Sequence, residues 1–268
     1  MQLQIRHETT YRYTAPAYYS IQLLRLTPRS EPHQRVLDWS IHAPGRLARA
    51  VDAYGNTTHT LVVQGAHDLI HVVVSGTLEV APLGGGRMPE GHHGSTLSPL
   101  VYTVPTALTE PAEPVRAFAA DKLRTAARGS DFVGFAEAIC EAVEYQPGAT
   151  EVTSAAADAL RIGRGVCQDH AHLFVACCRA RGIPARYVSG YFHSGETEQA
   201  ASHAWADVWL ENEGWVSIDV THRGFADERH CRLAVGRDYL SAAPVRGVRT
   251  GGGEESLKVD VAVRTPDQ

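Results

Sequence analysis

Cys167 lies where a loop leads into a predicted helix. The segment 163–178 starts with two glycines, and its apolar positions 171, 174, 175 and 178 share one helical face with Cys167. A thiol in the first turn of a helix lies beside unsatisfied backbone N–H groups and the positive end of the helix dipole, and both lower its pKa. The position indicates a nucleophile, although a small buried cysteine that only packs is the ordinary alternative.

A histidine and an aspartate on two later alternating runs could complete the chemistry. In the run 202–210 and in the run 215–221, His203 and Asp219 both lie opposite the apolar residues. If residues 211–213 form a three-residue hairpin loop, Leu210 pairs with Gly214 and Asp219 falls diagonal to His203, within hydrogen-bonding reach. A loop of two or four residues would put Asp219 on the wrong face.

Each of these residues alone has a structural explanation. A strand histidine is usually solvated or otherwise satisfied, and an aspartate at a strand end usually forms a turn or a cap. Taken together, Cys167, His203 and Asp219 supply the nucleophile, the base and the orienting acid of acyl transfer. Asp169, two residues after the cysteine, is expected to cap the helix start.

Four sequence blocks resemble the core of the transglutaminase-like superfamily. They are Gly-Val-Cys-Gln-Asp-His-Ala-His-Leu at 165–173, Arg-Gly-Ile-Pro-Ala-Arg-Tyr-Val-Ser-Gly-Tyr at 181–191, Ser-His-Ala-Trp-Ala-Asp-Val at 202–208 and Gly-Trp-Val-Ser-Ile-Asp-Val-Thr at 214–221. Residues 1–80 resemble the β module that precedes this core in bacterial members. The sequence departs from the common pattern at three positions, with His170 for an aromatic residue, Val220 for proline and His222 for asparagine.

The resemblance implies a papain-like triad of Cys167, His203 and Asp219 that forms an acyl-thioester with a peptide, protein or other amide substrate. If water attacks that intermediate, the protein is a cysteine protease or amidase, which is the function we expect. Attack by an amine would make it a protein-glutamine transamidase, an acyltransferase that crosslinks proteins. A non-catalytic module that only binds peptides is a third alternative.

An oxyanion hole is expected from the backbone N–H of Cys167 and a second donor. Tyr145 and Gln146 are the candidates for that donor. Gln168 and Trp205 are further candidates for contact with the substrate.

A zinc site and a phosphate loop are the competing interpretations of these residues. Cys167, His170, His172 and His203 carry suitable atoms, but these four residues contain neither a C-x₂₋₄-C knuckle nor a pair of histidines at the spacing of zinc ligands. The two glycines before Cys167 are not followed by Lys-Ser/Thr, as a phosphate loop requires. We therefore expect neither a metal nor a cofactor.

The elements around these residues predict an α+β protein. Residues 1–82 read as short strands separated by turns, typical of an all-β sandwich, and residues 83–100 are glycine-rich and read as a linker. Residues 101–250 place helices before an antiparallel sheet, as a papain-like core requires, and residues 251–268 form a flexible joint and a last strand whose sheet partner the sequence does not reveal.

The overall composition excludes several classes of protein. The chain has 268 residues, five cysteines in no small-scaffold spacing, and a net charge of -5 without a basic block, so neither a disulfide framework nor a nucleic-acid partner is expected. No run is long and apolar enough to span a membrane, and the first residues do not resemble a secretory signal. We expect a cytoplasmic protein whose oligomeric state the sequence leaves open.

Overall fold

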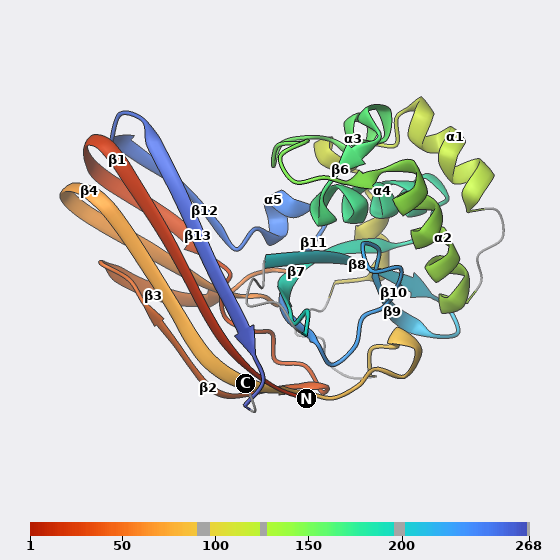
Figure 1. Ribbon diagram of the computed structural model, residues 1–268, viewed down its shortest axis with the longest axis horizontal. Helices are drawn as coiled ribbons and strands as arrows, with labels where there is room; N and C mark the ends of the chain where they lie inside the picture. The colour runs from red at the N-terminus through yellow and green to blue at the C-terminus, as the bar shows by residue number, and fades with distance from the viewer. Residues whose placement is uncertain (90–96, 124–127, 196–201, 267–268) are drawn as a thin grey trace.

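The computed structural model describes residues 1–89, 97–123, 128–195 and 202–266. A sheet of long strands stands against a second part, in which helices cover a shorter sheet (Figure 1). In that second part, four helices precede most of the antiparallel strands along the chain. The predicted α+β class and order of elements are confirmed.

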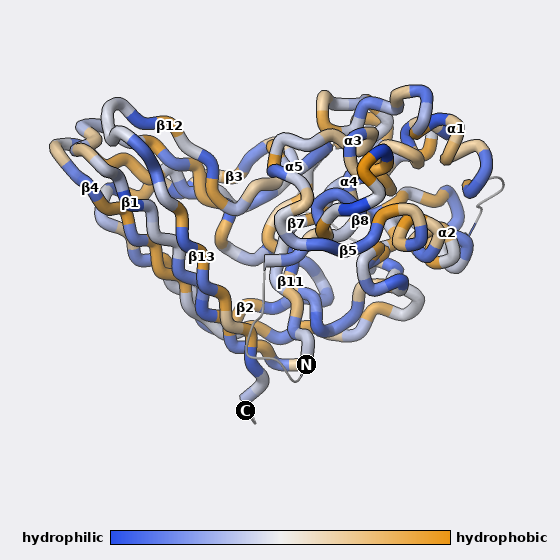
Figure 2. Tube along the Cα trace, turned by 45° about the horizontal axis from the view of Figure 1, so that its top comes forward, coloured by the Kyte–Doolittle hydropathy of each residue, from blue (hydrophilic) through white to orange (hydrophobic). Residues whose placement is uncertain are grey.

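Two long strands dominate the first sheet: β1 (Gln2–Leu24) and β4 (Thr57–Val80). They pair antiparallel, and β4 also pairs with β2 (Gln34–His42) and β3 (Arg46–Val51). Hydropathy alternates along these strands, as expected when successive side chains point to opposite faces (Figure 2). The segments predicted as separate short strands at 3–23 and at 60–74 are therefore parts of two continuous strands.

The end of the chain returns to the same sheet. Strands β12 (Val245–Gly251) and β13 (Glu255–Arg264) both pair antiparallel with β1, which supplies the missing partner of the last predicted strand. Val245–Gly251 thus pairs with the first sheet, although the sequence grouped it with the core. The module is all-β, as expected, but its strands form one six-stranded sheet rather than two facing sheets.

The second part supplies the other layer that the sheet needs. Leu3 and Ile5 of β1 belong to a buried apolar cluster that includes Tyr191, Cys231 and Leu233 of the second part. Alternation along a strand predicts one buried face but does not say what covers it. The core takes the place of the second sheet of a sandwich.

Polar contacts tie the sheet to the core as well. The side chain of Asn56 accepts from the N–H of Val235 at 2.9 Å and donates to its carbonyl oxygen at 2.8 Å. Nδ1 of His7 lies 2.7 Å from the hydroxyl of Tyr191. Because these groups are buried and paired, the two parts meet in a defined orientation.

The described parts of the predicted linker pack against the core. Three short 3₁₀ helices form here: η1 (Gly84–Gly86) lies within the predicted linker, η2 (Pro99–Thr103) begins at its end, and η3 (Ala107–Thr109) follows it. Met88 is buried in a cluster with Tyr102 and Trp215, and its N–H donates to the carbonyl oxygen of Trp215 at 2.8 Å. Residues 83–89 are therefore anchored and do not form a free spacer.

The core contains five helices and two sheets among the described residues. The helices are α1 (Glu113–Lys122), α2 (Gly129–Ala142), α3 (Ala156–Ile162), α4 (Cys167–Ala180) and α5 (Tyr239–Ala242). The main sheet has the order β10-β9-β8-β7-β11, with β7 (Ala185–Phe192), β8 (Ser202–Leu210), β9 (Gly214–Asp219), β10 (Gly224–Phe225) and β11 (His230–Gly236). Strands β5 (Glu144–Tyr145) and β6 (Arg164–Gly165) form a small parallel pair.

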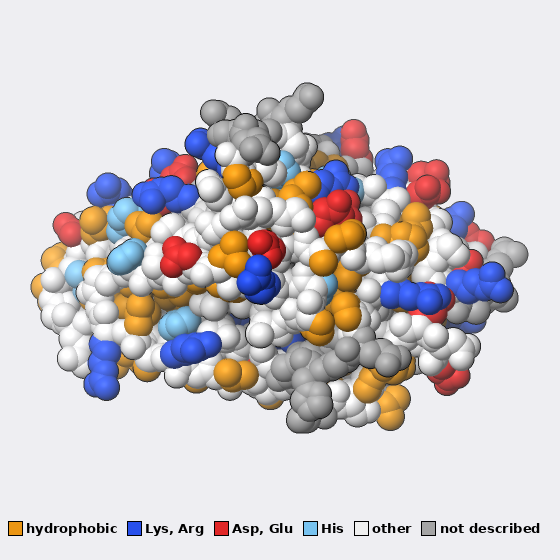
Figure 3. All heavy atoms as spheres, turned by 90° about the horizontal axis from the view of Figure 1, so that it is seen from below, with side chains coloured by type: hydrophobic (Ala, Val, Ile, Leu, Met, Phe, Trp, Pro, Cys, Tyr) orange, Lys and Arg blue, Asp and Glu red, His pale blue; other side chains and the backbone are white. Residues whose placement is uncertain are grey.

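Charges of both signs are interspersed over the face shown in Figure 3. That face carries no large patch of one sign of the kind that attracts a phosphate backbone. Among the described residues, no helix has the length and apolar character needed to cross a bilayer.

Candidate active site

Cys167 is the first residue of α4, and Val166 precedes it in an extended conformation. The carboxylate of Asp169 accepts the backbone N–H of Val166 at 2.8 Å and the hydroxyl of Thr150 at 2.6 Å. Asp169 therefore caps the start of the helix, as predicted. A side chain at Gly165 would lie 2.7 Å from Cβ of Asp169, so the glycine leaves room for the cap.

Helix α4 is held in place on all sides. Its residues from Gln168 to Arg179 are buried, and the helix contacts both β7 and β8. Ala171, one turn after the cysteine, packs with Tyr187 and Ala204 of the sheet, and Cys167 lies partly buried against this cluster. The first turn of α4 is thereby fixed at the edge of the sheet where β8 begins.

The hairpin between β8 and β9 has the predicted register. Leu210 pairs with Gly214 across the three-residue loop, and Asp207 pairs with Ser217. With this pairing, Nε2 of His203 lies 2.8 Å from Oδ2 of Asp219, both side chains being buried. The predicted contact between these two residues is confirmed.

His203 and Asp219 shift each other's pKa. Burial alone lowers the pKa of His203, but the carboxylate of Asp219 and an interaction with the Cys167 side chain outweigh it and raise the pKa to about 10. Burial raises the pKa of Asp219, but His203 and two further imidazoles reverse this effect, so that the pKa lies well below its ordinary value. These shifts favour an imidazolium ion paired with a carboxylate. Because Nε2 of His203 is hydrogen-bonded to Asp219, Nδ1 is the ring nitrogen that can interact with the Cys167 sulfur.

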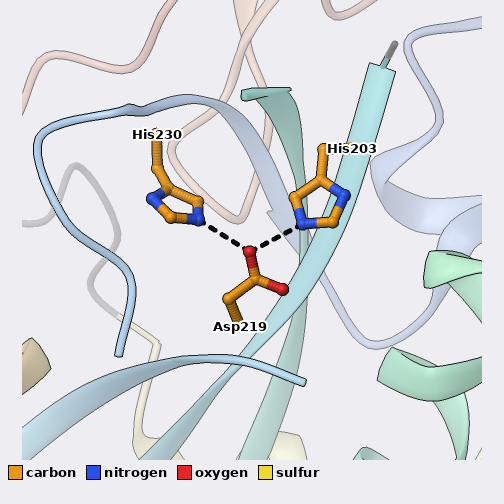
Figure 4. A group of neighbouring side chains, drawn as sticks. All are labelled: His203, Asp219 and His230. Carbon is orange, nitrogen blue, oxygen red and sulfur yellow. Dashed lines mark hydrogen bonds and ion pairs between the residues drawn. The ribbon is translucent and has the colours of Figure 1, made fainter. Parts of the chain in front are cut away.

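Two further histidines donate to Asp219, beyond the predicted triad. His222 Nδ1 and His230 Nε2 lie 2.7 and 2.8 Å from the same Oδ2 that bonds His203. Figure 4 shows His203 and His230 pointing at this oxygen from two sides. His230 also lies 3.0 Å from the carboxylate of Asp227 through Nδ1.

The sequence drew attention to His222 but not to His230. His222 stood out as a departure from the asparagine common at its position. His230 was missed because it reaches the site through the pairing of β11 with β7, which joins Cys231 to Tyr191 across a long stretch of chain. The only hint was the large number of histidines, fourteen in total.

The candidates for oxyanion and substrate contact are placed differently. Tyr145 and Gln168 line the cleft at Cys167, and Gln168 also donates its side-chain amide to the carbonyl oxygen of Val152 at 3.1 Å. The backbone N–H of Gln146 donates to the carbonyl oxygen of Gly165 at 2.7 Å, and the residue does not line the cleft. Trp205 is fully buried, stacks on His203 with ring centroids 5.9 Å apart and does not line the cleft either.

The residues considered as zinc ligands do not come together as one group. His170 bonds Thr221 Oγ1 and the carbonyl oxygen of Val143, at 3.0 and 2.9 Å. The N–H of Tyr239 donates to His172 at 3.0 Å. Among the described residues, the group whose ligand atoms all lie within 4.8 Å of one another is His203, Asp219 and His230 (Figure 4).

Comparisons with known sequences identify both parts of the chain. Residues 117–220 match the family model of the transglutaminase-like superfamily, and residues 3–79 match that of the bacterial transglutaminase-like N-terminal region. An uncharacterized protein of Mycobacterium leprae is 32% identical over 285 residues, which cover 97% of this chain and 98% of that protein. A protein-glutamine gamma-glutamyltransferase of Pseudomonas aeruginosa is 35% identical over 102 residues, which cover 33% of this chain and 15% of that protein.

A solved structure shares the whole fold. A protein from Cytophaga hutchinsonii, described as a candidate cysteine protease, superposes with a TM-score of 0.81 over 100% of this chain and 91% of its own, at 20% identity. At that level of identity the likeness concerns the fold. It supports the arrangement of a β module beside a helix-and-sheet core.

Proposed function

The chain belongs to the transglutaminase-like superfamily, and we propose that it is a cysteine amidase or protease with Cys167 as nucleophile, His203 as base and Asp219 as orienting acid. The observation that carries the proposal is the 2.8 Å contact between Nε2 of His203 and Oδ2 of Asp219, next to a cysteine in the first turn of a helix. Peptides or proteins are the proposed substrates.

In the first step, the Cys167 thiolate attacks the carbonyl carbon of the substrate amide. The developing oxyanion accepts the backbone N–H of Cys167, which has no helical acceptor at the first position of α4. The C–N bond then breaks, and the amine leaves with the proton that His203 held on Nδ1. The acyl group remains on sulfur as a thioester.

In the second step, water gives a proton to Nδ1 of His203, and its oxygen bonds to the carbonyl carbon. The C–S bond breaks with its electron pair on sulfur, so that the thiolate and the imidazolium return together. Asp219 keeps Nε2 protonated throughout both steps, which directs the exchanged proton to the nitrogen that faces sulfur.

Transamidation is the second candidate. It is favoured by the similarity of one third of this chain to the Pseudomonas aeruginosa protein, whose name describes glutamyl transfer from a glutamine side chain. The acyl-thioester of Cys167 would be the same, and an amine would replace water in the second step.

One experiment distinguishes the two candidates. Glutamine-containing peptides from a protein digest are incubated with the enzyme, with and without an excess of a primary amine, and the products are read by mass spectrometry. A hydrolase gives free acids in both arms, whereas a transamidase gives amine adducts in the second.

The matched control is Cys167→Ala, which removes the sulfur and little volume. This variant should form no product in either arm while it unfolds at the same temperature as the wild type. Equal turnover by Cys167→Ala and wild type would contradict the proposal.

A further inference from the structure

The cleft at Cys167 has one wall from the core and one from the β module. The cavity has a volume of about 340 Å³ and is bounded by Cys167 and His203 on the core side. On the opposite side it is lined by β1 and β13, through Thr9, Tyr11, Leu257 and Val259. The N-terminal and C-terminal strands therefore take part in the candidate active site itself.

The sheet register makes these four residues one continuous patch. Thr9 pairs with Val259 and Tyr11 pairs with Leu257 across the β1–β13 ladder. Directly paired residues point to the same face of a sheet, so all four side chains face the core across the cleft.

Large apolar side chains on both walls remain open to solvent. Leu257 is 55% exposed and Val259 is 45% exposed, although both line a cavity. On the core side, Tyr145 and Val152 are also more than half exposed. A substrate group that fills the cleft would remove this apolar surface from water, which favours binding of an apolar group.

Apart from the proposed Cys167–His203 pair, the described lining of this cleft carries no fixed charge. No lysine, arginine, aspartate or glutamate is among the described lining residues. His7, deep in the cleft, has its pKa lowered to about 4 by burial and is neutral at physiological pH. A charged substrate side chain in the cleft would lose its hydration and would find no ion-pair partner besides the reacting Cys167–His203 pair.

We propose that the cleft selects acyl donors with a large uncharged apolar side chain, aliphatic or aromatic, next to the reacting carbonyl. Leu257 and Val259 determine this preference, so that the β module acts as the specificity wall of the enzyme. This inference rests on the acyl chemistry proposed for Cys167.

The test uses electrophilic peptide probes that alkylate the thiol and carry leucine, phenylalanine, glycine, aspartate or lysine beside the reactive carbon. The rate of Cys167 labelling is measured for each probe, with iodoacetamide as a reference that has no side chain to select. We expect the leucine and phenylalanine probes to react about tenfold or more faster than the glycine, aspartate and lysine probes.

Three variants separate specificity from folding. In Leu257→Ser/Val259→Ser, the ratio of the leucine-probe rate to the glycine-probe rate should fall about tenfold, and the iodoacetamide rate of the same variant corrects for any change in the reactivity of the thiol. In Leu257→Asp, the lysine probe should label Cys167 faster than the aspartate probe, because the new carboxylate attracts a positive charge and repels a negative one. Val248→Ser is the control, because Val248 is an exposed residue of the neighbouring strand β12 that does not line the cleft.

The outcomes distinguish this inference from the function on which it rests. A wild type that labels the glycine probe as fast as the leucine probe, or a double variant that keeps the apolar preference, would overturn the specificity wall and leave the thiol chemistry intact. Failure of iodoacetamide to label Cys167 in the wild type would instead contradict the proposed function.

Discussion

His203 and Asp219 share a hydrogen bond of 2.8 Å because the loop between their strands has three residues. The loop length fixes which residues of β8 and β9 lie opposite each other, and one residue more or less would turn Asp219 to the other face of the sheet. The same register lets the indole N–H of Trp205 donate to the hydroxyl of Ser217 at 3.0 Å, which fixes the ring that stacks on His203. The base and its orienting acid thus depend on a turn remote from the thiol.

Alkylation should single out Cys167. Burial raises the pKa of Cys177, Cys178 and Cys231, and it also raises that of the partly buried Cys140, whereas Cys167 lies at an open cleft beside His203. With limiting iodoacetamide at neutral pH, peptide mapping over time should find Cys167 modified first. His203→Ala should slow this labelling. Modification of Cys140 or Cys231 ahead of Cys167 would contradict the scheme.

The stability of the fold should depend on pH through His203. Its pKa is raised from 6.5 to about 10, so the stabilisation it supplies is complete below pH 6.5 and is lost as the pH rises toward 10. Urea unfolding of the wild type between pH 6 and 10 should therefore show a decline that Asp219→Asn lacks. Parallel curves for the two proteins would show that the ion pair does not form.

His222 and His230 should weaken the electrostatic effect of Asp219 on His203, so that the pKa of His203 is lower than it would be without them. Each donates to the same carboxylate oxygen and competes for its charge. His222→Ala should therefore raise the pKa of His203, measured by NMR titration of the imidazole, and His230→Gln should act in the same direction. His42→Ala is the control, because His42 is exposed on β2 and outside the cluster. A fall in the pKa of His203 in both variants would refute the competition.

Asp207 should be among the residues on which stability depends most. It is fully buried and accepts from Arg186 at 2.7 Å and from Arg232 at 2.6 Å. Asp207→Ala would remove the carboxylate that pairs with buried Arg186 and would leave Glu31 as the carboxylate paired with Arg232, a loss of about 3–5 kcal/mol in the free energy of unfolding. Glu79→Ala breaks the exposed pair with Arg35 and should cost about 0–1 kcal/mol. Equal losses in the two variants, measured by denaturant unfolding, would argue against this ranking.

Two glycine substitutions should have opposite effects. In Gly165→Ala the new Cβ meets the Asp169 side chain and disturbs the cap at the start of α4, so both stability and labelling of Cys167 should fall. Gly134→Ala lies in α2 with no atom within 4 Å of the new Cβ, and it should raise stability by about 0.5–1 kcal/mol. Thermal unfolding and the alkylation rate measure both effects, and a neutral Gly165→Ala would show that the cap tolerates displacement.

Much of the candidate site could be predicted from the sequence because it depends on local rules. Helix periodicity and the glycines before it placed Cys167 at a helix start, and alternation together with loop length placed His203 beside Asp219. Asp169 was recognisable as a cap from its distance to the helix start. These features need only a few neighbouring residues to be defined.

The features that could not be predicted depend on pairings between distant segments. His230 reaches Asp219 through the pairing of β11 with β7, and Leu257 and Val259 reach the cleft through the pairing of β13 with β1. Hydropathy alternation says that a strand has a buried face but does not identify the surface that covers it. For this reason the module was expected to be a sandwich, and the core was not foreseen as its second layer.

The return of β12 and β13 to β1 also has a consequence for biosynthesis. During translation, β1 emerges from the ribosome well before its partners at residues 245–264. One edge of the nascent sheet must therefore stay unpaired while the whole core is being made, and an open edge of this kind is prone to pair with other chains. Leu257 and Val259 are made with β13, so the residues proposed to select the substrate are added only after Cys167, His203 and Asp219 have been made.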